Sequence, residues 1–104
     1  MKILIDHEGR AIRLTDERLA HILEHPEMQG MEGRIEETVR HPEKVLESLS
    51  DPQARLYYRL YLGTQVGDTH QCVEVKVANN DAFILTAYLV RQLPGGRQLW
   101  PKSD

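Results

Sequence analysis

The sequence has 104 residues and a mass of 12.0 kDa, and 40% of its residues are hydrophobic and 28% charged. These values are typical of a single folded domain, 1–104, with one hydrophobic core, and they exclude a disordered chain or a second domain. Thirteen basic and sixteen acidic residues give a net charge of −3, which excludes a bulk attraction to nucleic acid or anionic membranes.

The sequence contains no apolar run long enough to span a bilayer, and its first residues reach Asp6 too early for a signal peptide. Its one cysteine, Cys72, can form neither an internal disulfide nor a cysteine-built metal site. We therefore expect a cytoplasmic protein with no membrane partner, no metal and no cofactor.

The first half of the sequence predicts a hairpin followed by helices. Thr15 is a favoured N-cap residue, because its hydroxyl oxygen can accept from a free amide group of the first helical turn. The helix that it begins carries an apolar stripe of Leu19, Ile22 and Leu23 and closes at Pro26. The expected elements are strands at 2–5 and 11–14 joined by a turn at 7–10, helices up to Pro26 and from 31 to 40, and a helical turn from 42 to 48.

The second half contains three segments that alternate with a period of two residues, at 55–62, 71–77 and 82–91, as strands with one buried face do. The side chains expected to face the helices are Leu56, Tyr58, Leu60, Leu62, Val73, Val75, Val77, Phe83, Leu85, Ala87 and Leu89. The opposite face is mixed, and its expected rows are Arg59–Glu74–Thr86, Tyr57–Lys76–Ile84 and Tyr61–Cys72–Tyr88.

Helices followed by strands are typical of an α+β protein. We therefore expect a short N-terminal hairpin and two to three helices packed on a three- to four-stranded antiparallel sheet. The tail from Pro94 and Gly95 onward is expected to turn back, with Trp100 as an anchor against the rest of the domain.

The segment from His21 to His25 matches H-x-x-E-H, a helical pattern in which two histidines bind zinc and the glutamate acts as a base. We interpret the match as a coincidence, because Pro26 shortens the helix and a third ligand would have to come from a distant segment. Cys72 lies on a half-exposed predicted strand and is interpreted as filler rather than as a nucleophile.

The mixed face carries groups that suit a phosphodiester. Arg59 can bind two phosphate oxygens at once, Lys76 acts as a point charge, and the nearby Arg55 adds to substrate binding. Tyr57 and Tyr61 can stack unpaired bases. The alternative interpretation is a solvated face, on which both cations pair with Glu74 and the tyrosines fill the space between long side chains.

His21 has two interpretations as well. It lies away from the apolar stripe of its helix, so it is not a core histidine. It is either an exposed residue without a role or a general acid or base, since imidazole titrates near neutral pH.

The sequence resembles the phage-type barnase–EndoU–colicin–RelE-like nuclease domains from about Arg13 to Trp100. The motifs that carry the resemblance are Leu14-Thr15-Asp16-Glu17-Arg18, His21-Ile22-Leu23-Glu24-His25-Pro26-Glu27-Met28, Asp51-Pro52, Leu56-Tyr57-Tyr58-Arg59, Val73 to Val77 and Thr86-Ala87-Tyr88-Leu89. The resemblance implies helices packed on an antiparallel sheet whose open face is the active site, as in toxins and domains carried on phages and mobile elements.

The resemblance also implies residue roles. His21 matches the helical histidine, Arg59 and Lys76 the strand cations, and Thr86 with Tyr88 the polar pair of the last strand. The function that it implies is metal-independent RNA cleavage by an endoribonuclease or ribonuclease-toxin-like protein, with RNA as substrate and a cognate inhibitor protein as partner.

The acidic net charge departs from that of an ordinary basic ribonuclease. It argues against autonomous binding to free RNA and leaves room for a partner, for RNA in a ribosome or another RNA complex, or for an inactive descendant. Two alternatives stay open. One is a non-catalytic module of the same fold that binds nucleic acid or protein. The other is an interaction protein that self-associates through the strand 55–62 or through the tail at Trp100.

Overall fold

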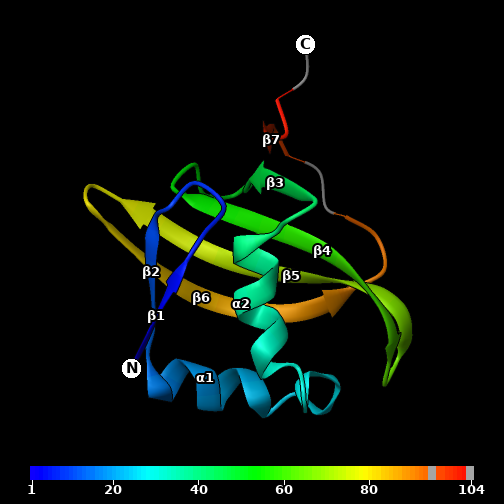
Figure 1. Ribbon diagram of the computed structural model, residues 1–104. Helices are drawn as coiled ribbons and strands as arrows, with labels where there is room; N and C mark the ends of the chain where they lie inside the picture. Colours follow the sequence, from blue (N-terminus) through cyan, green and yellow to red (C-terminus); the bar gives the residue numbers. More distant parts are fainter. Residues whose placement is uncertain (94–95, 103–104) are drawn as a thin grey trace.

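The computed structural model describes residues 1–93 and 96–102, and these form one mixed sheet of seven strands in the order β1-β2-β6-β5-β4-β3-β7 (Figure 1). The strands are β1 (Lys2–Ile5), β2 (Ala11–Leu14), β3 (Lys44–Glu47), β4 (Ala54–Thr64), β5 (Gly67–Ala78), β6 (Asp81–Val90) and β7 (Gln98–Trp100). The helices are α1 (Asp16–Leu23), α2 (Glu32–Arg40) and a short 3-10 helix, η1 (Pro26–Met28). None of these described helices is long and apolar enough to cross a membrane.

This architecture overturns the expected three- to four-stranded antiparallel sheet under two to three helices. The N-terminal hairpin belongs to the main sheet, since β2 pairs in parallel with β6 between Arg13 and Phe83. The segment 42–48, predicted as a helical turn, contains β3, and the tail contains β7. The expected turn at Pro94 and Gly95 lies outside the described residues.

The local signals at the start of the chain are confirmed. β1 and β2 form the predicted hairpin. Thr15 caps α1, and its side chain accepts a 3.1 Å hydrogen bond from the Arg18 amide. The helix ends at Leu23, and Pro26 occupies the first position of η1, where its missing N–H costs nothing.

The pairing of β4 with β5 differs from the expected register and decides which side chains face the helices. Arg59 lies opposite Gln71, not Glu74, and Tyr58, not Tyr61, lies opposite Cys72. The difference is three residues, an odd number, and a shift by an odd number moves every side chain of a strand to the other face. The expected pairs of Glu74 with Thr86 and of Cys72 with Tyr88 are confirmed.

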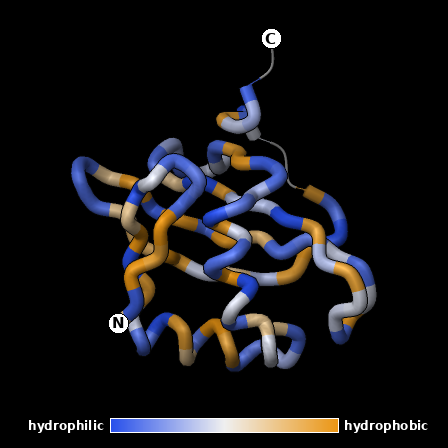
Figure 2. The backbone as a smooth tube through the Cα atoms, in the orientation of Figure 1, coloured by the Kyte–Doolittle hydropathy of each residue, from blue (hydrophilic) through white to orange (hydrophobic). Residues whose placement is uncertain are grey.

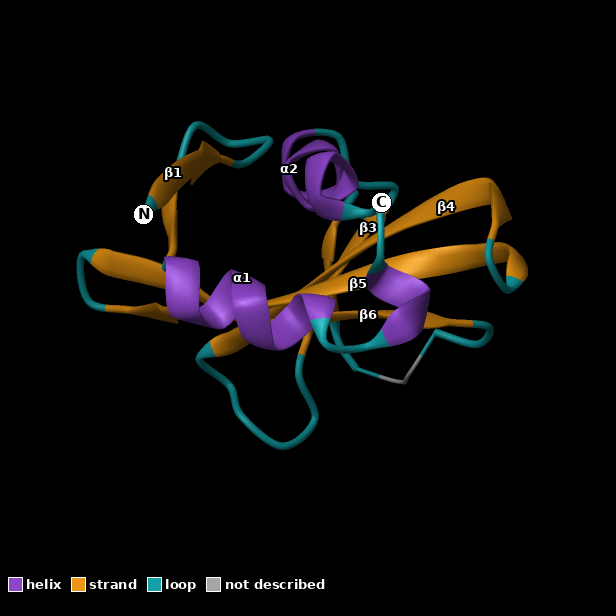
Figure 3. Cartoon of the chain, turned by 90° about the horizontal axis from the view of Figure 1, so that it is seen from below, coloured by secondary structure: helices purple, strands orange, loops and turns teal. Residues whose placement is uncertain are grey.

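The main core lies between the sheet and both helices (Figure 3). Tyr57 and Tyr61 of β4 belong to it, whereas the expected members Leu60 and Leu62 are exposed. Buried apolar members of this core include Ile12, Ile22, Ile35, Val39, Val73, Val75 and Ile84. Figure 2 shows hydrophobic positions along the central strands and hydrophilic ones in the turn between β5 and β6.

A second, smaller cluster lies on the face of the sheet that the helices do not cover. It is formed by Leu46, Leu56, Tyr58 and Cys72, against which Tyr88, Val90 and Leu93 pack. Because β4 lies between β5 and β3, it is not the free edge that self-association through 55–62 would need.

Candidate functional site

The sheet separates the cations that sequence reasoning places together. Arg59 lies on the helix side, where its Nη1 donates a 2.7 Å hydrogen bond to the His41 carbonyl oxygen. Lys76 lies on the opposite face, where its ammonium group pairs with Asp51 and holds the pKa of that carboxyl below its usual range. The two side chains therefore cannot bind one phosphate group.

Thr86 and Tyr88 share the face of Lys76, because they pair with Glu74 and Cys72. Burial, together with a contact to Cys72, raises the pKa of Tyr88 above its ordinary range. Burial also raises the pKa of the Cys72 thiol to about 11, so this cysteine is an inert core residue at neutral pH. The predicted catalytic face is mainly a packing surface.

His21 lies on the exposed side of α1, with its Nδ1 3.5 Å from Glu24 Oε2. Figure 1 shows α1 at the end of α2 that lies away from the turn between β1 and β2. The hollow beside His21 has a volume of about 450 Å³ and is lined by Thr15, Glu17, Arg18, Ala20, His21 and Glu24. Its two carboxylates against one guanidinium do not suit an RNA phosphate.

The tyrosines predicted to stack bases are core residues. Tyr57 is fully buried. Its pKa is raised above the ordinary range, mainly by burial and also by its hydrogen bond to Asp6. Tyr61 is 7% exposed, and its hydroxyl group contacts Thr38 Oγ1 at 3.1 Å. Neither ring offers a free surface to a base.

A different cleft gathers cationic, imidazole and aromatic side chains on the helix side of the sheet. Its volume is about 460 Å³, and it is lined by Asp6, His7, Arg40, His41, Pro42, Arg59 and Trp100. Of the site residues predicted from the sequence, Arg59 lines this cleft. Arg55 does not line it, but its Nη1 lies 3.6 Å from Oε1 of Glu8, the neighbour of His7 in the chain. We call it the His7 cleft.

Asp6 fixes the turn that carries His7. Its side chain is fully buried, and its Oδ1 accepts from the amide groups of Glu8 at 2.9 Å and Arg10 at 2.8 Å. Its Oδ2 accepts from the Tyr57 hydroxyl at 2.7 Å. Bonds to a buried carboxylate are stronger than neutral ones, so this turn is held rigidly against β4.

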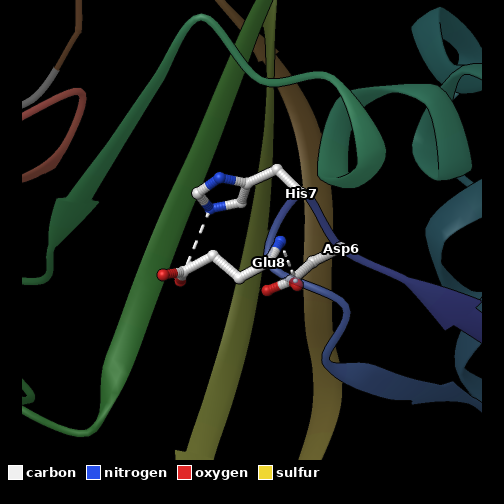
Figure 4. Close-up of side chains that lie close together, drawn as sticks. All are labelled: Asp6, His7 and Glu8. Atoms are coloured by element: carbon white, nitrogen blue, oxygen red, sulfur yellow. Dashed lines mark hydrogen bonds and ion pairs between the residues drawn. The ribbon is translucent and has the colours of Figure 1, made fainter.

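His7 and Glu8 lie side by side on this turn (Figure 4). The His7 side chain is 9% exposed, and its Nε2 lies 3.7 Å from Glu8 Oε1. This nitrogen is buried and makes no hydrogen bond in the described part of the chain. Glu8 is therefore the nearest side-chain partner of this imidazole, and the two side chains form a pair on the turn.

Two guanidinium groups and a second imidazole complete the polar lining. Arg59 is also 3.8 Å from Glu37, so it is partly neutralised, whereas the ion pairs within the described residues do not include Arg40. Arg40 and His41 lie at the C-terminal end of α2, whose dipole disfavours anions by up to about 1 kcal/mol. The charge of Arg40, which is in no ion pair of the described residues, outweighs that half charge.

Asp6, His7 and Glu8 have ligand atoms within 4.8 Å of one another, which is close enough for a metal ion. The chemistry of the group argues against this use. The Asp6 oxygens already accept three hydrogen bonds shorter than 3.0 Å, and guanidinium groups of Arg10 and Arg55 lie 3.9 and 3.6 Å from Glu8 Oε1. A divalent cation would have to displace those donors and would be repelled by those charges.

Sequence reasoning missed His7, Arg40, His41 and Trp100 as site residues. It read the turn at 7–10 as a connector and Trp100 as an anchor. The available signal was the composition of that turn, because an imidazole and a carboxylate on a tight loop are more often functional than residues inside an element. Comparisons with family models, curated proteins and solved structures find no match to this chain.

Proposed function

We propose that this protein is a ribonuclease that cleaves RNA in the His7 cleft without a metal ion. The observation that carries the proposal is that His7, which has Glu8 beside it, lines one cleft with His41, Arg40 and Arg59. A phosphodiester needs positive charge around its oxygens and groups that move protons, and this cleft holds both.

The reaction begins with the 2′-hydroxyl group of the substrate, whose oxygen bonds to the adjacent phosphorus atom. One imidazole of the cleft takes the hydroxyl proton, and the other protonates the 5′-oxygen as its bond to phosphorus breaks. His7, with Glu8 beside it, suits the first role and His41 the second. The products are a 2′,3′-cyclic phosphate and a 5′-hydroxyl end.

Arg59 and Arg40 stabilise the negative charge that develops during the reaction. The phosphoryl oxygens gain negative charge in the transition state, and a guanidinium group binds two such oxygens at once. The carbonyl oxygen of His41 holds Arg59 in place, so little reorganisation is needed when that charge develops.

The test is incubation of the purified protein with a labelled single-stranded RNA in excess chelator. We expect fragments that end in a 2′,3′-cyclic phosphate, and a fall of about 100-fold or more in His7→Ala and Arg59→Ala. His21→Ala and Lys76→Met are matched controls, since each removes the same kind of group away from the cleft, and both should cut normally. Intact RNA at an excess of wild-type protein, or loss of cleavage in His21→Ala but not in His7→Ala, would refute the proposal.

A non-catalytic RNA-binding module is the second candidate. Glu36 and Glu37 line a hollow next to Arg40 and His41, and together with the net charge of −3 they weaken attraction to free RNA. This favours RNA presented by a ribosome or another complex, or a partner protein such as an inhibitor. Salt-sensitive binding of RNA without any cleavage would favour this candidate over the ribonuclease.

A further inference from the structure

We infer that Trp100 is the base-binding wall of the His7 cleft, so that the ligand is one nucleotide with an unpaired base. This inference rests on the proposed function and narrows its substrate to single-stranded RNA. It draws on the position and exposure of Trp100 and on the arrangement of charge in the cleft.

Trp100 has a free surface that the other large aromatic residues near the cleft lack. It is 36% exposed, whereas Tyr57, on the neighbouring side of the turn, is fully buried. A tryptophan that served only to anchor the tail would bury most of its surface, as tryptophans do on average. Trp100 instead lines the cleft.

The ring of Trp100 is held in place from one side. Its centroid lies 4.8 Å from that of His7, with an angle of 59° between the planes. Its backbone is in β7, which pairs with β3 through Val45, and the Glu47 amide donates a 2.7 Å hydrogen bond to the Arg97 carbonyl oxygen. An indole positioned in this way needs little further ordering when a base stacks on it.

The cleft has separate places for the two parts of a nucleotide. Arg40 and Arg59 supply charge for a phosphate, and Trp100 supplies an aromatic face for a base. The volume of about 460 Å³ lies within the range of about 300–1,000 Å³ that small-ligand sites occupy. A bare phosphate would leave the aromatic side of this space unused.

Stacking of a base on Trp100 favours single-stranded over double-stranded RNA. In a double helix both faces of each base are covered by its neighbours, whereas an unpaired base can turn outward and stack on an aromatic side chain. Stacking accepts every base, so we expect a preference for single strands without a strong preference for sequence.

Trp100 is the only tryptophan of the chain, so its fluorescence reports on this wall directly. The probes are adenosine 3′-monophosphate, inorganic phosphate and adenosine, titrated into the full chain. We expect the nucleotide to quench the fluorescence and to bind roughly five- to 150-fold more tightly than inorganic phosphate, which is the usual effect of one stacked base.

Variants separate stacking from charge, with binding measured by calorimetry. Trp100→Leu should lower nucleotide affinity to that of inorganic phosphate, Trp100→Phe should keep most of the gain, and Arg59→Ala should weaken both phosphate ligands. Circular dichroism checks that Trp100→Leu is folded, and rescue by Trp100→Phe shows that the ring, not the fold, is responsible.

Equal affinity for nucleotide and inorganic phosphate, or undiminished nucleotide binding in Trp100→Leu, would overturn the inference. Cleavage of single-stranded RNA distinguishes this failure from failure of the proposed function. If the ribonuclease is real and the wall is not, Trp100→Leu cuts RNA as fast as the wild type. If the ribonuclease itself is wrong, the wild type cuts nothing, whatever nucleotide it binds.

Discussion

The hydroxyl group of Tyr57 donates a 2.7 Å hydrogen bond to Asp6 Oδ2, and both side chains are buried. This bond joins the middle of β4 to the turn between β1 and β2, 51 positions earlier in the chain. The turn carries His7, so the position of the imidazole depends on a contact inside the core. Tyr57, which was predicted to bind RNA, thus instead holds the turn of His7 in place from within the core.

Tyr57→Phe should therefore destabilise the protein and reduce RNA cleavage together. Loss of the hydroxyl group leaves a buried carboxylate oxygen with one partner fewer, which costs about 1–3 kcal/mol of unfolding free energy. Chemical denaturation measures that cost, and the RNA assay measures the loss of activity. Tyr88→Phe removes the same atom on the far face of the sheet, and it should leave cleavage unchanged. Equal activity of Tyr57→Phe and wild type would show that Asp6 holds the turn without Tyr57.

Alkaline pH should unfold the protein through its tyrosines. All four have raised pKa values, chiefly because of burial, and that of Tyr61 rises to about 12 from 10.0. A raised pKa means that the folded state favours the neutral phenol. The resulting stability is complete below about pH 10 and is lost as pH rises through the folded pKa values.

The measurement is absorbance at 295 nm, which reports tyrosinate, beside circular dichroism over the same pH range. We expect both signals to change in one step above about pH 10, as unfolding exposes the phenols. An absorbance change centred near pH 10 in a chain that keeps its native dichroism would contradict the burial of these rings.

Gly96→Ala should detach β7. The backbone of Gly96 has a φ of +148°, and an added Cβ would overlap the Glu47 carbonyl oxygen. We expect a red shift of Trp100 emission as the ring moves into water, together with weaker nucleotide binding. Gly33→Ala, in α2 with open space around it, is the control and should stabilise the protein by about 1 kcal/mol. Unchanged emission in Gly96→Ala would mean that β7 tolerates the clash.

Helices and strands could be predicted from the sequence where a segment carries a single strong local signal. Thr15 caps a helix by its own chemistry, and the strands predicted at 55–62, 71–77 and 82–91 correspond to β4, β5 and β6. Short strands such as β3, at Lys44–Glu47, have too few residues to show an alternating pattern in the sequence. Pairing with β4 stabilises this strand, and that contact cannot be read from the segment itself.

The face of β4 could not be predicted, because both of its faces are apolar enough to be buried. Leucine alternates with tyrosine and arginine, and the leucines look like the core. The face with Tyr57 and Tyr61 is the one that packs against the helices. Their hydroxyl groups form hydrogen bonds with Asp6 and Thr38, which offsets the cost of burying these polar groups. Those partners come from other elements, so no pattern within 55–62 reveals them.

The predicted site was wrong for the same reason. An odd change of register on β4 moved Arg59 away from Lys76 and toward His41 and His7. β6 adds an irregularity between its pairs with Glu74 and Val75, which turns Ile84 into the core although it was expected on the mixed face. A site made by side chains from several elements is therefore predicted only as well as its least certain register.

The His7 cleft joins a residue near the start of the described chain to Trp100, near its end. Trp100 is the last of the cleft residues to be synthesised. At about 5–20 residues per second, the ribosome needs roughly 5 to 20 s to proceed from His7 to Trp100. During that interval the nascent chain carries the imidazole and guanidinium groups of the cleft but lacks the indole, so the cleft is completed only when Trp100 has been added.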